Sequence, residues 1–173
     1  YWNLEKCFLD CKDLVGIVLP QEISKIGNSA FAGCAALNMI VLPEKITEIE
    51  ASTFSGCTAL TKVVIPAGVK RIGTAAFSEC SSLSEITLPE GIVNLESSVF
   101  SKCIALKSVT IPKEIQYISS GLFENCEALE CVILPDGIVK IDNSAFAECK
   151  ALKKIVMPDS LEEIGQEAFS GAG

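Results

Sequence analysis

Nine cysteines are the residues of this 173-residue sequence best suited to chemistry. Thiols can form disulfides, hold a metal ion as thiolates, or act as nucleophiles. Only Cys7 and Cys131 stand apart, because the other seven recur every 23 residues: Cys11, Cys34, Cys57, Cys80, Cys103, Cys126 and Cys149. The sequence contains no histidine, which removes the Ser–His and Cys–His nucleophile pairs and all imidazole metal sites.

The carboxylates offer no clearer chemistry. Close pairs occur at Glu48 with Glu50 and at Glu162 with Glu163. General acid–base catalysis needs a second group positioned beside such a pair, and the sequence supplies none. A glycine-rich phosphate loop that follows a strand and opens a long helix is also missing. We therefore predict no catalytic residue, no metal site and no cofactor, and we interpret the paired carboxylates as solubilising charge.

A 23-residue repeat must position all of these residues; one copy runs from Leu60 to Ser82, and Leu83 begins the next. It begins with a short β-branched segment, 63–65, which Pro66 ends because proline cannot donate to a sheet ladder. Two inward-facing aliphatic residues follow at 69 and 72 and predict a short second strand. The residues at 76, 77, 80 and 83 then share one face of a helical turn. Plausible N-cap residues precede that turn in five copies: Asn28, Thr74, Ser97, Ser120 and Asn143.

One such unit cannot close a core alone, so the repeat predicts a stack of coils. The expected fold is an α/β solenoid of about seven coils, with one parallel strand per coil at a spacing of ~4.8 Å. The repeated phenylalanines then form an internal column, and the repeated cysteines form another. We expect residues 1–173 to be a single domain and a segment of a longer array, because the pattern is irregular at both ends.

Stacking leaves three interpretations of the cysteine column open. Disulfides between neighbouring coils are disfavoured, because the strand spacing exceeds the ~3.8 Å between Cβ atoms that a disulfide prefers. A metal site is also disfavoured, because the stacked cysteine side chains point in parallel directions and do not converge as metal ligands must. Small buried apolar groups are the favoured interpretation. Cys7 should also lie in the core, since it occupies a repeat position held elsewhere by Ala, Thr, Val or Leu. Cys131 should instead be an exposed thiol on the strand surface.

Composition excludes two classes of partner. The net charge is −8 without any basic cluster, so a phosphate backbone would be repelled and nucleic acid is not expected. The longest apolar runs, such as residues 39–42, are far below the roughly 20 residues of a membrane-spanning helix. We therefore expect no membrane insertion within this segment.

These units resemble leucine-rich repeats of the BspA-like class, which share the aliphatic-proline strand end and the Ala-Phe-x-x-Cys-x-x-Leu segment. The resemblance implies a right-handed solenoid with its parallel strands on the concave side and short helical turns on the convex side. It also implies a cell-surface or secreted adhesion module. The ligand that it implies is a protein, such as a host extracellular-matrix or plasma protein.

The outward-pointing strand residues are the candidate binding surface on this interpretation. They alternate between a variable row and a row that is β-branched throughout, as a surface that contacts a partner can do. The predicted binding residues are Lys62, Val64, Glu85, Thr87, Ser108, Thr110, Cys131, Ile133, Lys154 and Val156. The β-branched row has a plain structural explanation too, since such residues favour strands. A structural spacer without a ligand and an intracellular protein-interaction scaffold are the alternative functions.

Overall fold

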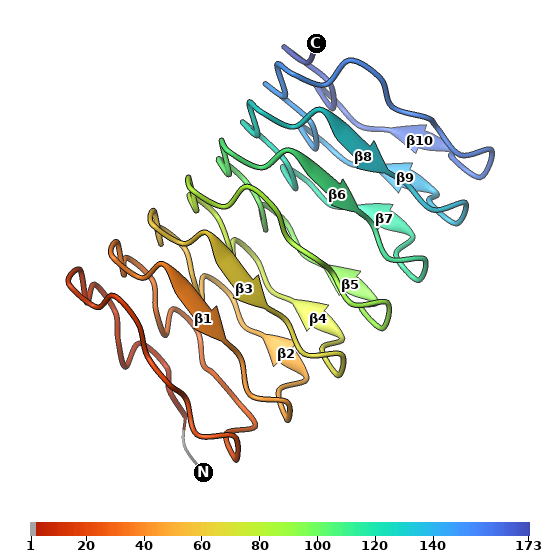
Figure 1. The fold of residues 1–173 in the computed structure, drawn as a ribbon. Coiled ribbons are helices and arrows are strands. Elements are labelled where there is room, and N and C mark those ends of the chain that lie inside the picture. Colours follow the sequence, from red (N-terminus) through yellow and green to blue (C-terminus); the bar gives the residue numbers. More distant parts are fainter. Residues whose placement is uncertain (1–2) are drawn as a thin grey trace.

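The computed structural model describes residues 3–173 as one stack of parallel coils (Figure 1). Partner residues in neighbouring strands are separated by 23 positions, as in the pair Ile40 and Val63. Two rows of strands run along the stack. The first row contains β1 (Met39–Val41), β3 (Lys62–Val64), β6 (Ser108–Thr110) and β8 (Cys131–Ile133). The second row contains β2 (Glu48–Ile49), β4 (Arg71–Ile72), β5 (Asn94–Leu95), β7 (Tyr117–Ile118), β9 (Lys140–Ile141) and β10 (Glu163–Ile164).

Strands of the first row follow the alternation that the sequence predicts. In each of them the central residue is buried and the two flanking residues are exposed. The flanking side chains therefore share one outer surface, which we call the first strand face. Strand and bridge pairings of this row extend over five coils, from Met39 to Ile133, rather than seven. The equivalent segments at 16–18 and 154–156 are extended but are not paired as strands.

The third side of each coil differs from the predicted helical turn. Within residues 3–173 no α-helix forms, and this side consists of consecutive turns. Ser52 and Gly56 have positive φ angles of 54° and 72°, a conformation that a right-handed helix does not contain. The N–H groups of Ser52, Phe54 and Gly56 donate to carbonyls of the next coil at 2.8–2.9 Å. The chain thus satisfies these donors between coils, where a helix would satisfy them locally.

This arrangement also reassigns the predicted N-cap residues. Thr74 accepts a hydrogen bond through its main-chain carbonyl from the N–H of Ser52 in the preceding coil. The corresponding carbonyls of Asn28, Ser97, Ser120 and Asn143 do the same. At every junction three such bonds run from an earlier N–H to a later C=O, so this ladder keeps one direction throughout the described chain.

A column of stacked aromatic rings fills the core. Consecutive rings from Phe8 to Phe169 lie 5.0–5.9 Å apart between centroids and are within 16° of parallel. The six rings from Phe31 to Phe146 are completely buried. Repeated aliphatic residues surround them, including Leu60 and Ile72. The predicted internal column is therefore confirmed, and each ring connects the coils on both of its sides.

Candidate binding face

All ten predicted binding residues are exposed on the first strand face. Parallel pairing places Ser108 beside Cys131 and Thr110 beside Ile133. On the other half of the face, Val41 lies beside Val64. Glu85 forms an isolated bridge with Ser108, whereas Thr87, Lys154 and Val156 lie in extended segments outside the named strands. The structure thus brings the predicted residues onto one surface.

That surface carries an apolar stripe with a polar centre. Val41, Val64, Ile133 and Val156 are between 42% and 70% exposed, so much of their apolar surface faces solvent. Thr87 and Thr110 occupy the same row between the two apolar halves. Exposed apolar groups bordered by polar residues are typical of protein-interaction surfaces.

The first strand face is interrupted at its centre. β3 pairs with β1 and β6 pairs with β8, but no strand pairing joins β3 to the following coil. A hollow of about 260 Å³ lies at this junction, lined by Lys62, Val63, Val64, Ile65, Thr87 and Pro89. Sequence reasoning missed the hollow, since residues 84–88 match the repeat pattern and nothing in them signals a break.

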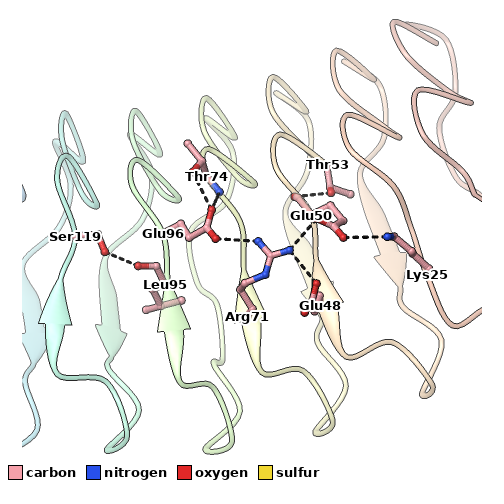
Figure 2. A network of polar contacts seen from close by, with 9 residues as sticks. All are labelled: Lys25, Glu48, Glu50, Thr53, Arg71, Thr74, Leu95, Glu96 and Ser119. Atoms are coloured by element: carbon pink, nitrogen blue, oxygen red, sulfur yellow. Dashed lines mark hydrogen bonds and ion pairs between the residues drawn. The ribbon is translucent and has the colours of Figure 1, made fainter.

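The sequence analysis also missed a charged surface on the second strand row, although its residues recur at a fixed repeat position. The second strand row presents Lys25, Glu48, Arg71, Asn94, Tyr117, Lys140 and Glu163 at successive coils. Figure 2 shows Arg71 between acidic side chains of the preceding and following coils. Its guanidinium donates to Glu48 and Glu50 at 2.8 Å and to Glu96 at 2.9 Å. Acidic and basic residues that alternate along this position are the signal that would have revealed the network.

The ionisation of this network is fixed by its contacts. The hydrogen bond to Glu48 is the largest of the effects that raise the pKa of Arg71, so the guanidinium remains charged. Burial raises the pKa of Glu96, but hydrogen bonds from Thr74 and Arg71 outweigh it and hold that pKa below its usual value of 4.5. The Thr74 hydroxyl and N–H donate to Glu96 at 2.9 and 2.8 Å. The network therefore joins neighbouring coils through a charged Arg71 and an ionised Glu96 near neutral pH.

The cysteine column is buried and unbonded. All nine cysteines are free thiols, and the six repeated ones from Cys34 to Cys149 have no exposed surface. Each of these six Sγ–H groups donates to the carbonyl of a phenylalanine 26 residues earlier, at 3.0–3.2 Å, as Cys80 does to Phe54. Burial raises the pKa of Cys57, Cys103 and Cys149 to about 12. These thiols are poor nucleophiles, because the thiolate is the reactive form.

The other three cysteines are not fully buried. Cys131 is exposed on the first strand face, as predicted. Cys11 is half-buried. The prediction that Cys7 lies in the core is wrong, because this residue is exposed in the first coil, where the described chain packs only the following coil against it.

Two further observations concern metal-binding groups and membrane-spanning helices. Among residues 3–173 no group of three or more His, Cys, Asp or Glu side chains is placed to hold a metal ion. The paired carboxylates of Glu48 and Glu50 both bond to Arg71. The described part of the chain contains no helix that is long and apolar enough to cross a membrane.

Comparison with known proteins provides a family match. The family model for the BspA type leucine rich repeat region matches six copies, over residues 4–130 and 79–172. A search of curated proteins gives no match.

Similar solved structures include proteins from three bacteria. A leucine-rich repeat protein from Bacteroides ovatus is 34% identical with a TM-score of 0.95, over 98% of this chain and 44% of that chain. A leucine rich cell surface protein from Faecalibacterium prausnitzii is 33% identical with a TM-score of 0.81, over 91% of this chain and 43% of that one. The leucine-rich repeat protein of T. pallidum is 34% identical with a TM-score of 0.81, over 87% of this chain and 70% of that one. This chain therefore spans less than half the length of the first two.

Proposed function

Because the chain belongs to the BspA type leucine-rich repeat family, we propose that it is a non-catalytic module that binds a protein through its first strand face. Proteins of this family are generally protein-interaction modules, which supports the binding role. The observation that carries the proposal is the exposed apolar stripe of Val41, Val64, Ile133 and Val156. Such a stripe can bury apolar area against a partner across several coils at once.

We further propose that the module acts at the cell surface or in a secreted protein and binds an extracellular-matrix or plasma protein. The similar protein from Faecalibacterium prausnitzii is described as a cell surface protein, which supports this location. The non-catalytic role is supported by the sealed cysteine column and by carboxylates that are paired with Arg71.

The test compares two variants of equal exposure on different faces. Ile133 on the first strand face is 57% exposed, and Val93 beside the second strand row is 58% exposed. Binding of wild type, Ile133→Glu and Val93→Glu is measured against a panel of immobilised extracellular-matrix and plasma proteins. We expect Ile133→Glu to weaken binding by at least about tenfold, because a carboxylate would be buried unpaired in the interface. Val93→Glu should change it by less than about twofold.

Circular dichroism is the control that checks whether both variants remain folded. Equal weakening by the two substitutions would contradict a role specific to the first strand face. Wild-type protein that binds no member of the panel would favour the alternative of a structural spacer. The continuous column from Phe8 to Phe169 favours such a spacer, because rings stacked 5.0–5.9 Å apart resist bending of the stack.

A further inference from the structure

We infer that the coil of residues 83–105 is a hinge between two rigid blocks of the stack. The first block contains residues 37–82 and the second contains residues 106–151. The blocks bend relative to each other about the turn side, which is the third side of each coil. This inference goes beyond the proposed function, because it concerns a motion of the chain without a partner.

The two strand rows are interrupted on opposite sides of the hinge coil. In the first row β1 pairs with β3 and β6 pairs with β8, but within residues 3–173 nothing pairs β3 with the segment 84–88. In the second row β2, β4 and β5 form one sheet and β7, β9 and β10 form another, so the pairing stops between β5 and β7. The hinge coil therefore joins the first block through β5 and the second block through the bridge from Glu85 to Ser108 (Figure 1).

Main-chain hydrogen bonds show the same two gaps. Where the first row is closed, the N–H of Lys107 donates to the carbonyl of Ser84 at 3.1 Å. Where the second row is closed, the N–H of Val139 donates to the carbonyl of Gln116 at 2.8 Å. The equivalent donors at the gaps are the N–H groups of Ser84 and Gln116. Neither has a main-chain acceptor in the part of the chain that the structure describes.

Each block is fully paired within itself. In the first block β1 pairs with β3 and β2 pairs with β4. In the second block β6 pairs with β8 and β7 pairs with β9. The segments 16–18 and 154–156 are unpaired as well, but they lie outside both blocks. The two central gaps thus separate two parts of the stack in which both strand rows are closed.

The turn side remains continuous through both gaps. The N–H of Phe77 donates to the carbonyl of Val99 at 3.0 Å. One coil later the N–H of Phe100 donates to the carbonyl of Leu122, also at 3.0 Å. Because hydrogen bonds hold their length within narrow limits, this ladder forms the axis of the bend and the strand rows are the sides that open.

The aromatic column passes through the hinge and limits its amplitude. The rings of Phe77 and Phe100 are 5.9 Å apart between centroids, the widest spacing in the column, and those of Phe100 and Phe123 are 5.6 Å apart. The rings remain stacked within 11° of parallel. The motion is therefore a small change of angle in which neighbouring coils stay in contact.

Each gap can open on one strand row only. At the first gap β4 and β5 stay paired, and Glu96 accepts hydrogen bonds from Arg71 and Thr74 of the preceding coil. This junction therefore opens on the first strand face. At the second gap the first row keeps its bridge, and on the second row the Ser119 hydroxyl donates to the carbonyl of Leu95 in place of a main-chain ladder (Figure 2). This junction therefore opens on the second strand row.

The hinge divides the first strand face. Val41 and Val64 lie on the first block, whereas Ile133 lies on the second. A bend alters the angle between these two apolar halves while each half keeps its own shape. The first strand face thus consists of two rigid surfaces with an adjustable centre.

Spin labels measure the motion as distances between the blocks. One pair of labels is placed on the first strand face, at Met39→Cys and at the native Cys131. The matched control pair is placed on the turn side, at Thr58→Cys and Lys150→Cys. All four positions are exposed, and each pair is separated by 92 residues, which is four repeats. We expect the distance distribution of the first pair to be at least about twice as wide, because only that pair lies on a side that opens.

The labelled chains need a background without other reactive thiols. Cys7 and Cys11, which have exposed surface, are replaced by serine in both, and Cys131→Ser is added for the turn-side pair. The six repeated thiols from Cys34 to Cys149 are buried and stay unlabelled. Circular dichroism checks that the labelled chains are folded.

Hydrogen exchange of the unmodified chain locates the motion. The N–H groups of Ser84 and Gln116 should exchange at least about tenfold faster than those of Lys107 and Val139, their equivalents in the next coil. The N–H of Phe100 should remain protected, because it belongs to the turn-side ladder of the hinge coil itself.

The outcomes that overturn the hinge are distinct from those that test the proposed function. Equal widths for the two label pairs, whether narrow or wide, would exclude bending about the turn side. Equal exchange at the gaps and at the closed junctions would show that both strand rows are continuous, and would overturn the hinge even if a labelled chain failed to fold. The proposed function is decided separately, by Ile133→Glu and Val93→Glu.

Discussion

Glu96 shows at the residue scale how one side chain connects coils. Its carboxylate accepts hydrogen bonds from Arg71 and from both the hydroxyl and the N–H of Thr74, all in the preceding coil. Hydrogen bonds to a charged group are stronger than those between neutral groups. The clamp therefore depends on the ionised form of Glu96, and its strength must follow pH.

We expect Glu96→Gln to destabilise the chain near neutral pH, and this difference should disappear in acid. The folded pKa of Glu96 lies below the usual 4.5, so its contribution is complete above pH 4.5 and is lost as the pH falls through the folded value. Urea unfolding of wild type and variant between pH 7 and 3 measures the difference. Glu79→Gln is the matched control, because Glu79 forms an exposed pair with Lys102. A difference that persists unchanged at the lowest pH would contradict the clamp.

The aromatic column determines stability at the scale of the repeated element. Phe77 is completely buried and lies 5.4 Å from Phe54 and 5.9 Å from Phe100, measured between ring centroids. Its removal leaves a cavity that faces both neighbouring coils. In an array where each coil contacts only its neighbours, a loss in the middle weakens two interfaces, whereas a loss at an end weakens one.

We therefore expect Phe77→Ala to lower the free energy of unfolding by about 3–5 kcal/mol. Phe8→Ala should have a clearly smaller effect, because Phe8 is half-buried and stacks on one ring only in the described chain, Phe31. Denaturant unfolding monitored by circular dichroism provides both values. Equal losses at the two positions would show that the column does not couple successive coils.

The sequence predicts the strand elements well and the turns poorly. Alternation within 62–64 correctly places Val63 inside and its neighbours outside. The turns were misassigned because Ser52 is not a glycine, so its residue type does not indicate a positive φ. The break beside β3 could not be predicted either, since no residue of 84–88 departs from the repeat. The Arg71 network left a signal in the sequence, the opposite charges at successive copies of one repeat position, but the structure was needed to show which acidic side chains contact Arg71.

At the scale of the whole molecule, the buried thiols link stability to alkaline pH. Burial raises the pKa of the six repeated thiols from Cys34 to Cys149 above the ordinary 9.0. Folding therefore keeps these groups protonated where the unfolded chain loses the protons. Their contribution is complete below pH 9 and declines as the pH rises towards the folded values.

We expect the stability advantage of wild type over Cys103→Ala to shrink above pH 9, by up to about 1.4 kcal/mol per pH unit. The decline should end near pH 12, the folded pKa of Cys103. Guanidinium unfolding in the presence of a reductant, between pH 8 and 11, measures it. Cys131→Ala is the matched control, because Cys131 is already exposed. A constant difference between wild type and Cys103→Ala across this range would mean that Cys103 is solvated in the folded chain.

The one-way ladder on the turn side gives that side of the stack an electrical polarity. At each junction three N–H groups point towards the later coil and three C=O groups point back, as Phe54 and Ala76 do. Peptide dipoles aligned in this way add, and in an α-helix the same alignment places about half an elementary charge at each end. The turn side thus carries its positive pole at the last coil and its negative pole at the first, the reverse of the order along a helix. Acidic groups are favoured near the last coil and basic groups near the first.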